Sequence, residues 1–244
     1  MKRLDQRVFA LDWIRGIAVI GMVLHHALVS VQMAGWMHGK NVQIPFLETE
    51  LFWVLQEIFV VAFLLISGIC TAYSRSVLRR GLIVSGAAML VTLVTAYLMP
   101  ALGVDGMQIW FGILHMFGAS MLLYGLITCK QRWVGGLTAL GLLVLWLVMI
   151  HLPASEVAVH LRLAIGFPYA GFYSADYYPL LPYFFGFLAG AVLGPAVRVR
   201  KFPRWFYTLR LRPLEWVGRH SLIIYLLHQI VLFGLSYLFF FITA

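Results

Sequence analysis

Residues 11–26 read LDWIRGIAVIGMVLHH, and the rest of the chain is best understood from this stretch. It opens a long apolar run, yet it contains Arg15 and, eleven positions later, His26. Eleven residues are close to three helical turns, so both side chains are expected on nearly the same helix face, about 16 Å apart along the axis. His25 is rotated from His26 by about 100°. In a helix that crosses a membrane, Arg15 would lie near one surface and His26 near the middle, where an ionisable group by default indicates function.

The composition indicates an all-α integral membrane protein. Of the 244 residues, 62% are hydrophobic and 11% are charged, whereas a soluble domain carries about 25% charged residues. No polar stretch is long enough for a separate soluble domain, so we expect a single domain over residues 1–244. Lys2 and Arg3 precede the first apolar run as in a signal peptide, but the run is long and has no small-residue cleavage site, which predicts a retained helix.

The apolar runs predict a bundle of about seven transmembrane helices. A spanning helix needs about 20 mostly apolar residues. The stretches that qualify are 13–34, 51–73, 80–99, 108–128, 132–152, 178–196 and 219–242.

The basic residues predict a cytoplasmic N-terminus, because Lys and Arg collect in cytoplasmic loops. With that orientation, sixteen of the 18 Lys and Arg residues lie inside, and only Lys40 and Arg162 lie outside. The net charge of +9 therefore reflects topology, and we expect no nucleic acid partner. The basic segment 198–217 is expected to lie along the anionic lipid of the inner leaflet.

Several ionisable residues are expected at membrane depth. His26, His115 and His228 come from three different spans, and Glu57 lies in the second span near its outer end. Each has a structural alternative, such as a helix–helix hydrogen bond for a histidine or an ion pair for Glu57.

Packing alone does not require three such histidines. The pattern suggests a polar route through the bundle, with a cytoplasmic end at Arg15 and an outer end near His115 and Asp176. Asp176 and Tyr177 lie in an aromatic outer loop, which either forms an interfacial belt or lines a site for a ring-shaped substrate.

Five motifs occur in an order that resembles a known family. They are DWIRG (12–16) followed by His26, FLLISG (63–68), GILH (112–115), DYYPLLP (176–182) and GRHSLIIYLLHQ (218–229). Together they resemble the bacterial members of the heparan-alpha-glucosaminide N-acetyltransferase catalytic-domain family, over about residues 8–230. The spacing of Arg15 and His26 is also similar to that of the broader acyltransferase-3 family.

The resemblance implies transfer of an acyl group, typically acetyl, from cytoplasmic acyl-CoA to an acceptor outside, commonly a sugar. It makes His26 the catalytic histidine and associates Arg15 with the acyl donor. A histidine suits this chemistry, because acyl transfer from a thioester needs a group that titrates near neutrality. His26 would act either as a general base on a hydroxyl or amine or as a short-lived acyl carrier. The oxyanion would be stabilised by His228 or Ser221.

The remaining assignments follow from this interpretation. His228 and His115 are further catalytic candidates. Arginine binds phosphate well, so the CoA site is expected at the inner surface, whereas the acceptor site is expected toward the outside. The candidates for the CoA site, besides Arg15, are Arg75, Arg79, Arg80, Arg219 and Ser221. The candidates for the acceptor site are Glu57, Asp176 and Tyr177. We expect acetyl-CoA as co-substrate and no metal.

Two other functions are compatible with the same residues. A proton-coupled transporter would use His26, Glu57, His115 and His228 as a relay, although no internal inverted repeat is visible. A b-type cytochrome would use paired axial histidines such as His26 and His228. The acyltransferase is preferred. We expect a multi-pass enzyme of the bacterial inner membrane that contacts lipid and forms a homo-oligomer as one alternative. Its expected acceptor is a sugar or cell-envelope glycan on the outer face.

Overall fold

The computed structural model describes residues 8–128 and 162–243, and within these ranges the regular structure is helical. Five described segments are long and apolar enough to cross a membrane. They are α1 (Phe9–Met37), α2 (Glu50–Ile69) with its extension to Tyr73, α3 (Val77–Thr92) continued to Ala101, α8 (Leu180–Arg198) and α11 (Ser221–Ile242). The prediction of an all-α membrane protein is confirmed.

The boundaries agree with the predicted spans except at the fourth. There the apolar helix α5 is Ile113–Ile127, whereas a helix over 108–128 was predicted. Residues 108–112 are not helical and bond to the segment before α8, since the Gln108 carbonyl accepts from the Ala175 N–H at 2.9 Å. The span predicted over 132–152 lies outside the described residues.

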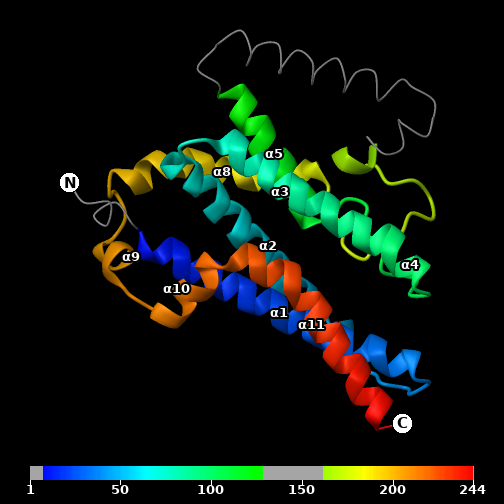
Figure 1. The fold of residues 1–244 in the computed structure, drawn as a ribbon. Helices are drawn as coiled ribbons and strands as arrows, with labels where there is room; N and C mark the ends of the chain where they lie inside the picture. Colours follow the sequence, from blue (N-terminus) through cyan, green and yellow to red (C-terminus); the bar gives the residue numbers. More distant parts are fainter. Residues whose placement is uncertain (1–7, 129–161, 244) are drawn as a thin grey trace. The chain divides into compact units, whose positions relative to one another are not determined.

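The chain divides into two compact units, one of residues 1–67 and 193–244 and the other of residues 68–192. In the first unit, α1 lies beside both α10 (Arg212–Arg219) and α11, as Figure 1 shows. Glycines allow the close approach of α1 and α10. A Cβ at Gly16 would overlap the Leu214 carbonyl, and one at Gly218 would overlap the Asp12 carbonyl.

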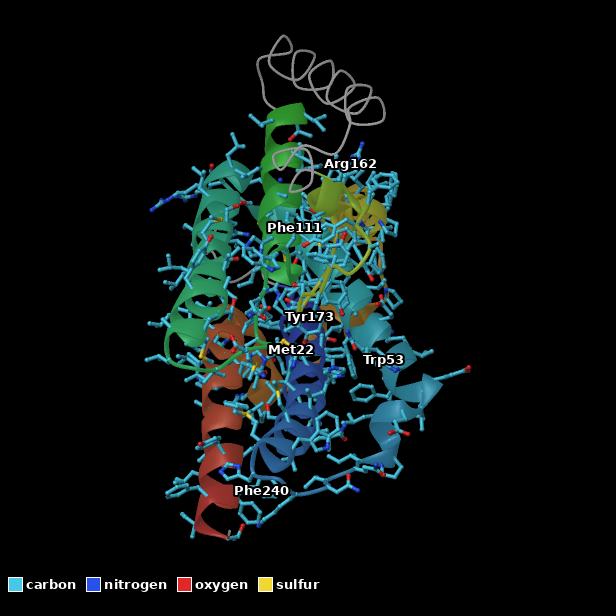
Figure 2. The ribbon with its side chains drawn as sticks, turned by 90° about the vertical axis from the view of Figure 1, so that its right-hand side faces the viewer. Met22, Trp53, Phe111, Arg162, Tyr173 and Phe240 are labelled. Carbon is cyan, nitrogen blue, oxygen red and sulfur yellow. The ribbon has the colours of Figure 1, made fainter. Side chains whose placement is uncertain are left out.

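Helices α1 and α11 run in the same direction. His26 contacts His228 near the middle of the pair. Toward the C-terminal ends, a Cβ at Gly35 would lie 3.3 Å from Phe240, which is 7% exposed and labelled in Figure 2. Lys40 follows α1 and donates to the Thr243 carbonyl at 2.9 Å, so the ends of the two helices are joined.

In the second unit, α3 and α5 pack closely. The Ser76 hydroxyl caps the start of α3 by accepting from the Arg79 N–H at 3.2 Å, and such a cap satisfies one of the free donors of the first turn. Gly118 of α5 lies against Ser85 of α3, where a side chain would clash. Small residues at helix contacts are typical of membrane bundles.

Candidate active site

Two histidines from α1 and α11 form the centre of the candidate site. The ring centroids of His26 and His228 are 4.9 Å apart, with an angle of 52° between the planes. His228 is 9% exposed. Two imidazoles in direct contact leave no room for a porphyrin between them, so this geometry disfavours a shared haem.

The hydrogen bond of His228 determines which nitrogen carries its proton. Nδ1 lies 2.6 Å from the Tyr225 carbonyl oxygen. A carbonyl can only accept, so Nδ1 is the donor, and in the neutral ring Nε2 holds a lone pair. Within the described part of the chain, Nε2 is buried and has no hydrogen-bond partner.

His25 is directed to a different neighbour. Its ring stacks on Phe52 of α2, with centroids 4.2 Å apart and planes 12° apart. It meets His26 edge-on at 5.1 Å. His25 therefore has an aromatic packing partner, whereas His26 is the histidine that contacts His228.

Arg15 lies at the other end of this face of α1. Its guanidinium carbon is 5.9 Å from the centre of the Phe63 ring, and its Nη1 is 4.0 Å from Asp12 Oδ1. The side chain is 17% exposed. The α1/α10 crossing at Gly16 and Gly218 is next to it along the helix. Arg15 is thus held by its neighbours with part of its surface accessible.

An ion pair beside this crossing was not foreseen from the sequence. Arg210 donates to both carboxylate oxygens of Glu215, at 2.9 and 3.0 Å, and lies 3.8 Å from the centre of the Phe9 ring. Glu215 is 2% exposed. Arg219 donates through Nε to the Glu215 carbonyl at 3.1 Å. The sequence did contain one clue to this ion pair, because Glu215 is the only acidic residue after position 193 and lies among several arginines.

This pair predicts an acid-sensitive stability. The two hydrogen bonds from Arg210 lower the pKa of the Glu215 carboxyl. The stabilisation is therefore complete above the unfolded-state pKa, about 4.3, and is lost as the pH falls through the lower folded-state pKa. Arg210→Ala should reduce the free energy of unfolding at pH 7, because it removes both side-chain hydrogen bonds to the Glu215 carboxylate.

Thermal unfolding in detergent between pH 7 and pH 3 would measure this effect. Arg212→Ala is the matched control, because Arg212 is an exposed arginine of the same segment, and surface changes are usually within about 0.5 kcal/mol. Equal losses in the two variants would contradict the role of the Arg210–Glu215 pair.

The other residues predicted for the donor site are divided between the units. Arg219 ends α10 and Ser221 begins α11 in the unit that holds Arg15. The three arginines near the start of α3 belong to the other unit and are exposed; they are Arg75, Arg79 and Arg80.

His115 stands in a closed hydrogen-bond chain. Its Nδ1 accepts from the Gly112 N–H at 3.2 Å, so in the neutral ring Nε2 donates to the Thr92 hydroxyl, 3.0 Å away. Thr92 in turn donates to the Ile109 carbonyl at 2.8 Å. These contacts tie the start of α5 to α3 and occupy both ring nitrogens.

Asp176 and Tyr177 also bond to backbone atoms. Asp176 accepts from the Ile113 N–H at 3.0 Å, in the first turn of α5. The Tyr177 hydroxyl donates to the Leu163 carbonyl at 2.8 Å, and burial raises its pKa. Both side chains hold these segments together in this structure, and their role in acceptor binding stays a prediction.

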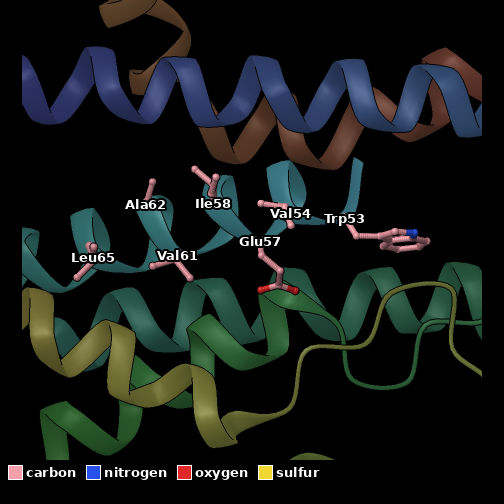
Figure 3. A pocket seen from close by; sticks show the side chains of 7 residues that line it. All are labelled: Trp53, Val54, Glu57, Ile58, Val61, Ala62 and Leu65. Atoms are coloured by element: carbon pink, nitrogen blue, oxygen red, sulfur yellow. The ribbon is translucent and has the colours of Figure 1, made fainter. Parts of the chain in front are cut away.

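Glu57 occupies an apolar face of α2. Figure 3 shows its carboxylate on the side of the helix lined by Trp53, Val54, Val61 and Leu65. These side chains line a shallow surface depression, and all the residues that line it come from α2. In the described ranges, no group of three or more His, Cys, Asp and Glu side chains is arranged to hold a metal.

One comparison with known proteins gives a match. The family model described as heparan-alpha-glucosaminide N-acetyltransferase, catalytic, matches residues 7–230. The matched range contains Arg15, His26, His115 and His228, and it confirms the family expected from the motifs. No curated protein and no solved structure shows significant similarity to the chain.

Proposed function

We propose that this protein transfers an acetyl group from acyl-CoA to an amine or hydroxyl acceptor. The premise is its family: the chain belongs to the heparan-alpha-glucosaminide N-acetyltransferase catalytic family. The observation that carries the proposal is the contact between His26 and His228 within the matched range. Imidazole is the side chain best suited to proton or acyl transfer near neutral pH. The acceptor is a sugar or cell-envelope glycan on the outer face.

The site residues take their roles by position. His26 acts on the reacting centre, as a general base or as the nucleophile. Arg15 binds the CoA phosphates, since a guanidinium pairs well with phosphate oxygens. Arg219 and Ser221, which belong to the same compact unit, contribute to the donor site. Arg75, Arg79 and Arg80 supply further positive charge at the inner surface. His115 positions the start of α5.

The experiment that tests the function uses the full-length protein in membranes. Labelled acetyl-CoA is supplied together with a cell-envelope extract, and the labelled product is isolated and identified. Transfer of the label to a glycan, in membranes with the protein but not in membranes without it, is the expected result. Accumulation of an ion or solute without any labelled product would favour a transporter and overturn the proposal.

The orientation is a separate prediction. With sixteen of the 18 Lys and Arg residues on one side, the N-terminus is expected in the cytoplasm of a bacterial inner membrane and the C-terminus outside. Reporter fusions after residue 130 and after residue 244 should therefore report opposite sides of the membrane. The same side for both would contradict a topology of seven spans.

A further inference from the structure

His228 offers a basic nitrogen that the rest of the structure does not use. Nδ1 is committed to the Tyr225 carbonyl at 2.6 Å. This bond fixes the ring orientation and the tautomer. Nε2 therefore has an available lone pair, is buried, and has no partner among the described residues. A buried polar atom without a partner costs free energy, and a catalytic role is one recognised explanation for such an atom.

The tautomer excludes one role and favours another. A neutral His228 with its proton on Nδ1 cannot donate a hydrogen bond from Nε2 to an oxyanion, which was one role considered from the sequence. The same tautomer can accept a proton at Nε2. The ring of His26, the residue proposed to act on the reacting centre, lies beside it with a centroid distance of 4.9 Å.

We infer that His228 Nε2 is the proton acceptor for the amine or hydroxyl that receives the acetyl group, and that the Tyr225 carbonyl holds it in the basic tautomer. This inference rests on the proposed function, and it gives the base role to His228 and leaves His26 the role of nucleophile. In the first step the His26 nitrogen bonds to the acyl carbon and the carbon–sulfur bond of the thioester breaks. In the second step the bond from the acceptor nitrogen or oxygen to the acyl carbon forms and the bond from that carbon to His26 breaks. The acceptor proton passes to His228 Nε2 and then to the CoA thiolate. Neutral His228 is thereby restored.

The first arm of the test measures the tautomer without any substrate. Nitrogen NMR of histidine-labelled protein, with His228→Asn used to assign the signal, should show a neutral His228 protonated on Nδ1. Free imidazole side chains favour the other tautomer, so this result would not arise by default. A proton found on Nε2 would overturn the inference.

The second arm separates base catalysis from structure. His228→Asn retains an N–H that can reach the Tyr225 carbonyl but removes the basic nitrogen. Its rate of acetyl transfer to the envelope acceptor should fall by at least about 100-fold, the low end for one acid–base group. Hydroxylamine is largely deprotonated and strongly nucleophilic at neutral pH, so formation of acetohydroxamate by the variant should stay within about tenfold of the wild type.

His220→Asn is the matched control. Its Nδ1 lies 2.8 Å from the Trp216 carbonyl, a backbone contact of the same kind, but it stands at the junction of α10 and α11. This variant should keep both rates. A parallel loss of both rates in His228→Asn would indicate a structural role, and no loss in either would remove His228 from the chemistry. A wild-type protein that releases no CoA with either nucleophile would refute the proposed function itself.

Discussion

His26→Ala should lower the turnover of acetyl transfer by about 10²–10⁴-fold, the range expected for the loss of one acid–base group. His26 is the histidine that contacts His228, at a centroid distance of 4.9 Å, and it lies within the matched family range. Folding should survive the change, because hydrogen bonds within membrane bundles average only about 0.6 kcal/mol. The measurement is acetyl transfer by purified protein whose thermal unfolding has been checked.

His25 provides the control on the neighbouring face of the same helix. Its ring stacks on Phe52 with centroids 4.2 Å apart, so His25→Phe keeps an aromatic ring there while removing both nitrogens. This variant should be far milder than His26→Ala. A well-folded His26→Ala protein with near-normal turnover would contradict the assignment. An inactive His25→Phe variant together with an active His26→Ala variant would show that the catalytic histidine lies on α1 but is His25, on the neighbouring face.

The release of CoA without acceptor distinguishes the two roles of His26. A covalent acyl-histidine would release CoA in a burst before any acceptor is added, whereas a general base would not. The burst should be absent in His26→Ala and present in His25→Phe if the carrier mechanism applies. The experiment uses the same protein preparations as the turnover measurement.

The helices could be predicted because hydropathy reports them directly. Runs of about 20 apolar residues identified six of the segments that the structure describes as helical, and the seventh lies outside the described residues. The exception is the fourth predicted span, which was expected to start at residue 108 but whose helix begins at Ile113. Residues 108–112 are apolar enough to extend α5, yet the Phe111 carbonyl accepts from the Tyr178 N–H at 3.1 Å. A pairing between segments more than sixty residues apart leaves no mark on local hydropathy.

The candidate site could be predicted only in part. Spacing placed Arg15 and His26 on one face of α1, because helical periodicity is local. The contact of His26 with His228 depends on the register of α1 against α11, which is set by contacts such as Gly35 with Phe240. The tautomer of His228 depends on a backbone carbonyl, that of Tyr225, whose position is independent of the residue type.

The hydrogen bonds of His115 could not be predicted from its residue type, and its catalytic role stays a prediction. A histidine in an apolar helix suggested chemistry, but both of its nitrogens are engaged, by the Gly112 N–H and by the Thr92 hydroxyl. Whether a membrane histidine is available for catalysis depends on the hydrogen bonds of its two nitrogens. Those bonds involve backbone atoms and a threonine from another helix, which the sequence does not pair in advance.

Arg15→Ala should weaken the binding of acetyl-CoA by about 10- to 100-fold. Charge-assisted hydrogen bonds to phosphate are worth about 1.5–3 kcal/mol, and 1.4 kcal/mol corresponds to about tenfold in affinity. The guanidinium is held by Phe63 and by Asp12 with 17% of the side chain exposed. It is therefore positioned before the donor arrives, and less conformational entropy is lost on binding.

A donor without the nucleotide phosphates separates this role from a structural one. Acetyl-pantetheine carries the thioester but lacks the phosphates, so Arg15→Ala should reduce its use far less than that of acetyl-CoA. Phe63→Leu is the matched control, because it removes the ring 5.9 Å from the guanidinium but keeps the charge, and it should retain most of the affinity for CoA. Equal losses with both donors in Arg15→Ala would mean that Arg15 supports the fold around α1 and does not contact the donor. A loss confined to acetyl-CoA would place the phosphates of the donor at Arg15, on the same face of α1 as His26.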